Sequence, residues 1–279
     1  GKSKEIVMEK FPISKFLELW KKSIHSAIVQ FLDHTQIDKT IESSNSINGS
    51  EKPLMPSYYK NIRKDILSIV PSDAKNILEI GCAAGMTGNE LKKKPGVYVA
   101  GVELDHNAAI EAKSVLDDVI EGDIEDINLP YENETFDCLL FADILEHLKD
   151  PLTVLKNTSK LLKPNGTLIA SIPNVQYLGV VNQLIEGNWT YQDEGILDRT
   201  HLRFFTYHEI EKLFTDAGYE IIQVNETLDP QYDIAKDSMS TLNIGRLSIR
   251  DLSPEELKKF FVFQYKVSAK LITDNRPKE

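Results

Sequence analysis

Short apolar runs alternate with amphipathic stretches through the middle of the chain. Five apolar runs rich in branched and aromatic residues predict strands, at 76–80, 97–103, 115–122, 136–142 and 166–173. Stretches with helical spacing between and after them predict helices, at 86–94, 106–114, 145–162 and 207–217. Strands that alternate with helices are typical of a parallel sheet covered by helices on both faces.

The end of the chain departs from this alternation. Two more strands are predicted at 219–227 and 260–271, with no clear crossover helix between them. Parallel neighbours need such a crossover, so we expect these two strands to be antiparallel. The stretch 229–259 is then an insertion before the last strand, and its pattern predicts no definite structure.

The beginning of the chain has a different character. Residues 14–32 place apolar side chains at helical spacing, and residues 41–53 are rich in serine, asparagine and glycine, which is typical of a linker. We therefore divide the chain into an N-terminal helix and linker at 1–55 and one α/β domain at 56–279.

Composition and charge exclude several classes of protein for this chain. Hydrophobic residues make up 41% and charged residues 27% of the 279 positions, as in soluble globular proteins. The net charge of −11 argues against a nucleic-acid partner, because phosphate binders are normally basic. No apolar run approaches the roughly 20 residues of a membrane span. Only two cysteines and no signal-peptide pattern lead us to expect a cytoplasmic protein.

The segment LEIGCAAGMTG at 78–88 follows a predicted strand and opens a helix. Gly81 and Gly85 permit a tight turn and close approach of a ligand to the backbone. The spacing does not fit a dinucleotide fingerprint, and no Gly-Lys-Ser/Thr follows to make a phosphate loop. The next strand ends at Glu103, whose carboxylate can accept from a ribose diol, and the third ends near Asp123. Together these residues predict an adenosine site without phosphates.

With these residues the chain resembles class I S-adenosylmethionine-dependent methyltransferases. LEHLKDP (145–151), LLKPNGTLIASIPN (161–174) and GNWTYQDEGILDRTHLRFFT (187–206) resemble the branch associated with polysaccharide and cell-surface glycan biosynthesis. The resemblance implies a Rossmann-like sheet of seven strands with the last one antiparallel, and S-adenosylmethionine as cofactor. One departure is Ala83, where the family usually has glycine.

The resemblance also implies a set of cofactor-binding residues along the strand ends. Glu103 as a solvated carboxylate and Asp123 as a loop cap are the structural alternatives. The residues of the set are Glu79, Gly81, Cys82, Ala83, Gly85, Glu103, Leu104, Asp123, Ile124, Ala142 and Asp143.

Methyl transfer to a hydroxyl benefits from a general base, whereas an amine needs only a neutral lone pair. His147 and His201 are the predicted catalytic residues, because both fall in segments expected at the ligand-binding edge of the sheet. A structural role for Glu146 and His147 is the alternative. Asp143, Glu146, His147 and His201 also have the ligand types for a divalent cation, a possibility that we do not favour.

The segment 187–206 is expected to face the acceptor. Trp189 and Tyr191 suit stacking on a sugar ring, and Arg199 and Arg203 suit a sugar phosphate. Three of these residues also have a structural alternative, in the core for Trp189 and in surface ion pairs for the two arginines.

The function that follows is methyl transfer to a hydroxyl or amine of a sugar, a sugar nucleotide or a related small molecule. The acceptor is then a small molecule or glycan, and the oligomeric state is left open. A non-catalytic adenosine-binding module in a glycan assembly complex is one alternative. An RNA or protein methyltransferase is another, with the acidic charge against RNA.

Overall fold

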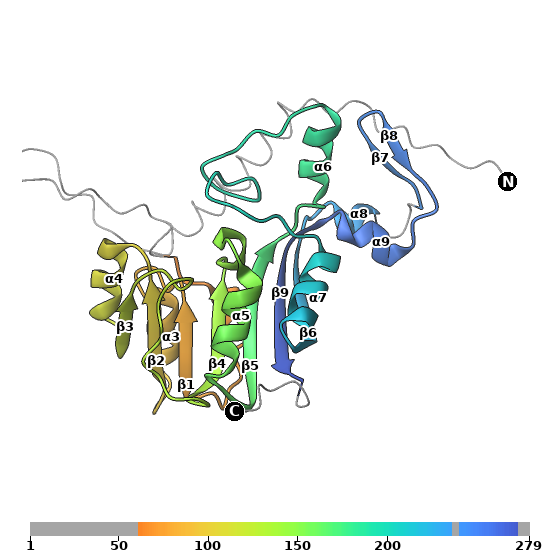
Figure 1. The fold of residues 1–279 in the computed structure, drawn as a ribbon. Helices are drawn as coiled ribbons and strands as arrows, with labels where there is room; N and C mark the ends of the chain where they lie inside the picture. Colours follow the sequence, from red (N-terminus) through yellow and green to blue (C-terminus); the bar gives the residue numbers. More distant parts are fainter. Residues whose placement is uncertain (1–60, 236–239, 273–279) are drawn as a thin grey trace, which may run out of the picture. The chain divides into compact units, whose positions relative to one another are not determined.

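A computed structural model describes residues 61–235 and 240–272 of the chain (Figure 1). The predicted N-terminal helix and linker at 1–55 lie outside the described residues. Within the described residues, no helix is long and apolar enough to cross a membrane.

A seven-stranded sheet organises the described residues, in the order β3-β2-β1-β4-β5-β9-β6. The first five strands are parallel, and β9 lies antiparallel between β5 and β6. The predicted fold class, with its antiparallel last strand, is therefore confirmed. The strands are β1 (Asn76–Ile80), β2 (Tyr98–Glu103), β3 (Asp118–Glu121), β4 (Phe136–Ala142), β5 (Leu162–Pro173), β6 (Tyr219–Leu228) and β9 (Val262–Leu271).

Helices cover both faces of this sheet because successive strand residues point to opposite sides. Ile77 of β1 belongs to an apolar cluster with α2 (Lys64–Leu67), α3 (Met86–Lys92) and α4 (His106–Lys113). Its neighbour Leu78 belongs to the opposite cluster, with α5 (Pro151–Ser159) and α7 (Tyr207–Asp216). Both clusters are fully buried, which fixes the register of the central strands.

The prediction of one helix over 145–162 is wrong. A short 3-10 helix, η2 (Leu145–His147), is followed by an extended residue, Leu148, and only then by α5. Pro151 opens α5 because its missing N–H is unneeded there, and it disfavours helix at the residue before it. Asp150 caps the new helix by accepting from the Thr153 N–H at 3.0 Å. The break leaves His147 at the edge of the sheet, outside any long helix.

Five short elements that follow β5 and β6 in the chain form a small second layer, which we call the cap. It consists of α6 (Leu178–Ile185), α8 (Tyr232–Ala235), β7 (Leu242–Ile244), β8 (Leu247–Ile249) and α9 (Pro254–Lys259). Their apolar residues form a cluster of their own, which includes Phe260 and Phe261. The buried Asn174 amide anchors the cap by donating to the Lys259 and Val262 carbonyls, at 2.9 and 2.8 Å.

Candidate active site

The turn after β1 uses three left-handed positions, each two residues from the next. The φ angles are +69° at Gly81, +49° at Ala83 and +75° at Gly85. A side chain at Gly81 would overlap Ile144, so that position needs glycine. The left-handed backbone at Ala83 gives the physical reason why glycine is usual there. Alanine adopts it at a cost of about 1–2 kcal/mol.

Glu103 closes this turn from the neighbouring strand. Its carboxylate is 8% exposed and accepts from the Ala83 and Asp105 N–H groups, each at 2.8 Å. Each carboxylate oxygen keeps a second lone pair, so Glu103 can still accept from two hydroxyls of a ligand. Leu104 beside it is 68% exposed and presents apolar surface at the same strand end.

The end of β3 lies next to Glu103, because the Gly122 N–H donates to the Glu103 carbonyl at 2.9 Å. Asp123 accepts from the Glu125 N–H at 2.9 Å, which is the loop-capping geometry considered as its structural alternative. One of its carboxylate oxygens makes this bond, and Ile124 packs partly buried against the core. Loop capping thus accounts for one of the two Asp123 oxygens.

Glu79 lies beneath the turn and is 3% exposed. Burial raises its pKa to about 8, against the hydrogen bond from the Gly88 N–H, so the carboxyl is largely neutral at pH 7. Cys82 is also buried, and burial raises the pKa of its thiol, which therefore stays protonated.

Asp143, just past β4, is held by protein groups. Its carboxylate accepts from the Ser171 hydroxyl at 2.7 Å and the Gln264 amide at 2.6 Å, and it pairs with the Arg63 guanidinium. Its backbone is left-handed, with φ +55°. Asp143 and the preceding Ala142 thus stand at the predicted edge, with the Asp143 carboxylate turned into this network.

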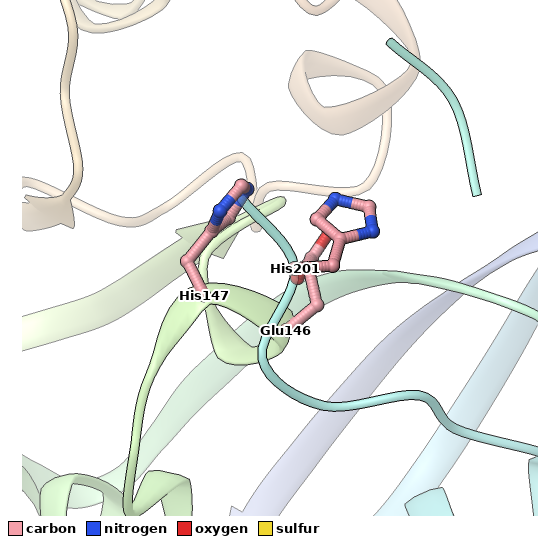
Figure 2. A group of neighbouring side chains, drawn as sticks. All are labelled: Glu146, His147 and His201. Carbon is pink, nitrogen blue, oxygen red and sulfur yellow. The ribbon is translucent and has the colours of Figure 1, made fainter. Parts of the chain in front are cut away.

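Glu146, His147 and His201 form one cluster (Figure 2). One ligand-type atom from each lies within 4.8 Å of the others. The Leu202 and Arg203 N–H groups donate to the Glu146 carbonyl, at 2.8 and 3.0 Å, and thereby hold the His201 segment on η2. The structure therefore brings together the two predicted catalytic histidines and adds Glu146.

Hydrogen bonds fix the orientation of both imidazoles. The His201 Nδ1 lies 2.9 Å from the Ile196 carbonyl, and the His147 Nδ1 lies 3.2 Å from the Thr200 carbonyl. A carbonyl oxygen only accepts, so each Nδ1 carries a proton, and a ring with no second proton keeps its lone pair on Nε2. A lone pair on Nε2 can accept a proton or bind a cation.

Burial dominates the electrostatics of the cluster. It raises the pKa of Glu146 well above its ordinary value, and the charge of Asp143 adds to this effect. Both Glu146 carboxyl oxygens lack a hydrogen-bond partner among the described residues. Burial, followed by the neighbouring His201, lowers the pKa of His147, so its imidazole is neutral at pH 7. The cluster is thus a buried carboxyl beside two histidines, of which His147 is neutral at pH 7.

Aromatic rings continue from His201 into the segment 187–206. Phe204 lies 6.3 Å from the His201 ring, and Trp189 and Tyr191 lie 5.2 and 6.5 Å from Phe204, between centroids. Trp189 is 38% and Tyr191 48% exposed, so neither is a core residue. The sequence reasoning missed Phe204, although its place directly after the predicted Arg203 was the available signal.

The two arginines of this segment are engaged by the protein. Arg203 donates to the Lys149 carbonyl and, at 3.1 Å, to the Leu202 carbonyl. Arg199 pairs with Asp193 at 2.5 Å on the exposed surface. The ion pair is the alternative considered for Arg199, whereas Arg203 fastens the segment to the chain after η2.

The comparisons with known proteins point in one direction. A family model described as a methyltransferase domain matches residues 55–224. The ubiquinone biosynthesis O-methyltransferase of Coxiella burnetii (strain RSA 331 / Henzerling II) is 24% identical over 173 residues, 58% of this chain and 73% of that protein. The enzyme of the same name from Cereibacter sphaeroides is 25% identical over 169 residues, 56% of this chain and 65% of that protein.

Solved structures match the fold. An S-adenosylmethionine-dependent methyltransferase of Thermotoga maritima, described as a possible histamine N-methyltransferase, has a TM-score of 0.50 and 21% identity, covering 74% of this chain and 86% of that one. One from Mesorhizobium loti has a TM-score of 0.50 and 16% identity, covering 74% of this chain and 95% of that one. At these identities the likeness concerns the fold alone.

Proposed function

The chain belongs to the methyltransferase-domain family and is an S-adenosylmethionine-dependent methyltransferase, and on this premise we propose that it methylates a hydroxyl group of a small ring-shaped acceptor. The observation that carries the proposal is the cluster of Glu146, His147 and His201 at the end of β4. Family membership favours an enzyme over a non-catalytic adenosine-binding module.

The cofactor fits the first three strand ends. The free lone pairs of Glu103 suit the two ribose hydroxyls, and the exposed Leu104 with Ile124 suits the faces of the adenine ring. The left-handed turn lets the backbone approach the rest of the molecule. The other residues in the assigned set are Glu79, Gly81, Cys82, Ala83, Gly85, Asp123, Ala142 and Asp143.

S-adenosylmethionine, when bound, supplies a methyl group already activated by its sulfonium sulfur. The protein must then orient the acceptor and take away its proton. Nε2 of a neutral histidine accepts the hydroxyl proton while the oxygen lone pair forms the new carbon–oxygen bond. S-adenosylhomocysteine would leave with the electrons of the broken carbon–sulfur bond, and the histidine would later release the proton to water. An amine acceptor would not need this cluster, so its presence favours a hydroxyl.

The aromatic residues of 187–206 suit a flat or pyranose ring. Trp189 and Tyr191 are half-exposed and lead through Phe204 to His201. A glycan sugar is the first candidate, because this segment carries the resemblance to the glycan branch. A phenol is the second, because two similar enzymes are named for ubiquinone biosynthesis. The arginines pair with protein groups, so a phosphate on the acceptor is not required.

An acceptor screen with methyl-labelled S-adenosylmethionine tests the proposal. Matched pairs of compounds, a sugar or a catechol and its amino analogue, separate oxygen from nitrogen methylation. We expect label in an O-methyl ether and none in the amino analogues. Label only on nitrogen would contradict the proposal, and the preferred ring identifies the acceptor class.

A cation-assisted reaction is the second candidate, favoured by one observation. Glu146, His147 and His201 offer three ligand atoms within 4.8 Å, and carbonyls hold both Nδ1 atoms as in many metal sites. These residues therefore fit a small divalent cation, which would lower the pKa of the acceptor hydroxyl.

A further inference from the structure

A threonine hydroxyl links His147 to a carboxylate. The Thr200 Oγ1 lies 2.6 Å from the Asp198 Oδ1 and 3.2 Å from the His147 Nδ1. A hydroxyl has one hydrogen, and an ionised carboxylate only accepts. The hydrogen of Thr200 therefore goes to Asp198, and its oxygen faces His147 as an acceptor. The donations therefore run from the imidazole through the hydroxyl to the carboxylate.

We call this hydrogen-bonded chain of Asp198, Thr200 and His147 the relay. Further hydrogen bonds make it rigid. The Thr200 N–H donates to the same Asp198 oxygen at 2.7 Å, and the His201 N–H donates to the Asp198 carbonyl at 3.1 Å. A bond from a side chain to a backbone N–H two residues later is a common turn device. This one differs because the hydroxyl continues to a residue of another element, η2.

We propose that Asp198 and Thr200 are positioning residues that make His147, rather than His201, the general base. This inference rests on the proposed function. The Thr200 hydroxyl and carbonyl both accept from His147 Nδ1–H, which leaves the Nε2 lone pair for the acceptor proton. When Nε2 takes that proton, the ring becomes positive and the Asp198 carboxylate stabilises it through the hydroxyl.

Among the described residues, His201 has no equivalent hydrogen-bonded chain to a carboxylate, although the charge of Asp198 also acts on it through space. Its Nδ1 donates to the Ile196 carbonyl, a neutral group, and the described residues place no hydroxyl–carboxylate pair behind it. A neutral carbonyl fixes the tautomer but does little to stabilise the imidazolium. The rings of the two histidines lie only 4.7 Å apart, and the relay is the feature that distinguishes His147 from His201.

Three variants of the full-length protein test the relay. Asp198→Asn removes the negative charge behind the Thr200 hydroxyl, while the amide oxygen can still accept from that hydroxyl. Thr200→Val breaks the link to the carboxylate, and Thr200→Ser restores it. Asp193→Asn and Thr190→Val are matched controls from exposed positions of the same segment.

We expect kcat to fall about 10- to 100-fold in Asp198→Asn and Thr200→Val, within the range of general-base effects, with KM for S-adenosylmethionine unchanged. Thr200→Ser should recover most of kcat, and the controls should stay within twofold. Imidazole nitrogen NMR without acceptor should show His147 protonated on Nδ1 in the wild type, with its imidazolium forming only at lower pH in Asp198→Asn.

Two results would overturn the relay. One is an unchanged pH titration of the His147 imidazole in Asp198→Asn together with kcat within twofold of wild type. The other is a loss of kcat that follows lower thermal stability and that Thr200→Ser does not restore. Failure of the proposed function is separate, because it shows as label only on nitrogen or as full activity when both His147 and His201 are replaced by alanine, whereas the NMR reports the relay without any reaction.

Discussion

The imidazole rings of His147 and His201 lie edge to face with centroids 4.7 Å apart. His147 belongs to η2, directly after β4, and His201 to the segment that returns from the cap. Two N–H groups of that segment bind one carbonyl, that of Glu146, and keep the rings together. The candidate catalytic centre therefore depends on how this segment is fastened to η2.

Replacement of Arg203 should lower the free energy of unfolding more than replacement of Arg199. Arg203→Ala removes the bond to the Lys149 carbonyl and should lower the free energy of unfolding by about 1 kcal/mol, with a lower kcat as the segment loosens. Arg199→Ala breaks only an exposed ion pair and should cost less than about 0.5 kcal/mol. Denaturant unfolding of both variants measures this difference. Equal costs would argue against Arg203 as the fastening residue.

Glu103→Ala should weaken binding of S-adenosylmethionine by about 1.5–3 kcal/mol, because a charged acceptor of two ligand hydroxyls is lost. Calorimetry on the wild type and the variant gives the difference directly. Glu220→Ala, at an exposed position of β6, is the control and should bind as the wild type does. Unchanged affinity in Glu103→Ala would remove that residue from the site.

Glu79 should make stability depend on pH. Its pKa is about 8 in the folded protein and 4.5 in its ordinary state, so between these values the unfolded chain has lost a proton that the folded protein keeps. The free energy of unfolding then falls as pH rises through this window, by up to about 1.4 kcal/mol per pH unit. Glu79→Gln cannot ionise, so its stability relative to wild type should increase from pH 5 to pH 8. A constant difference across urea titrations at these pH values would refute the buried neutral carboxyl.

The fold was predictable from sequence because its signals are local and repeated. Each strand is a short apolar run, and the glycines at positions 81 and 85 indicate the left-handed turn directly. The predicted helix at 145–162 was wrong because its apolar spacing continues through a break, and the deciding signal was Pro151. The cap was not predicted because its short elements are stabilised by one another, as Phe260 and Phe261 show.

The candidate site was predictable in part. Its histidines follow from their positions at strand ends, but the partners of Arg203 do not, because a backbone carbonyl such as that of Lys149 has no sequence signature. The bond from Thr200 to His147 joins elements far apart in the chain. Such a contact depends on the packing of the folded segment, which no local pattern encodes.

Removal of divalent cations separates the histidine base from the cation-assisted reaction. With a histidine base, activity after treatment with a chelator and desalting should stay within twofold of the untreated enzyme. Loss of activity that Mg²⁺ or Mn²⁺ restores would instead assign Glu146, His147 and His201 to a cation. Apparent S-adenosylmethionine affinity serves as the control and should be the same in both samples.

Methyl transfer by His147→Ala and His201→Ala, singly and together, tests the central claim most directly. The assay follows label from S-adenosylmethionine to the best acceptor of the screen, with cofactor affinity measured in parallel and His208→Ala as an exposed control. We predict that His147→Ala and the double variant lose at least about 100-fold in kcat, that His201→Ala loses less, and that all bind the cofactor as the wild type does. Activity in the double variant equal to that of His208→Ala would contradict the assignment of this cluster as the catalytic centre.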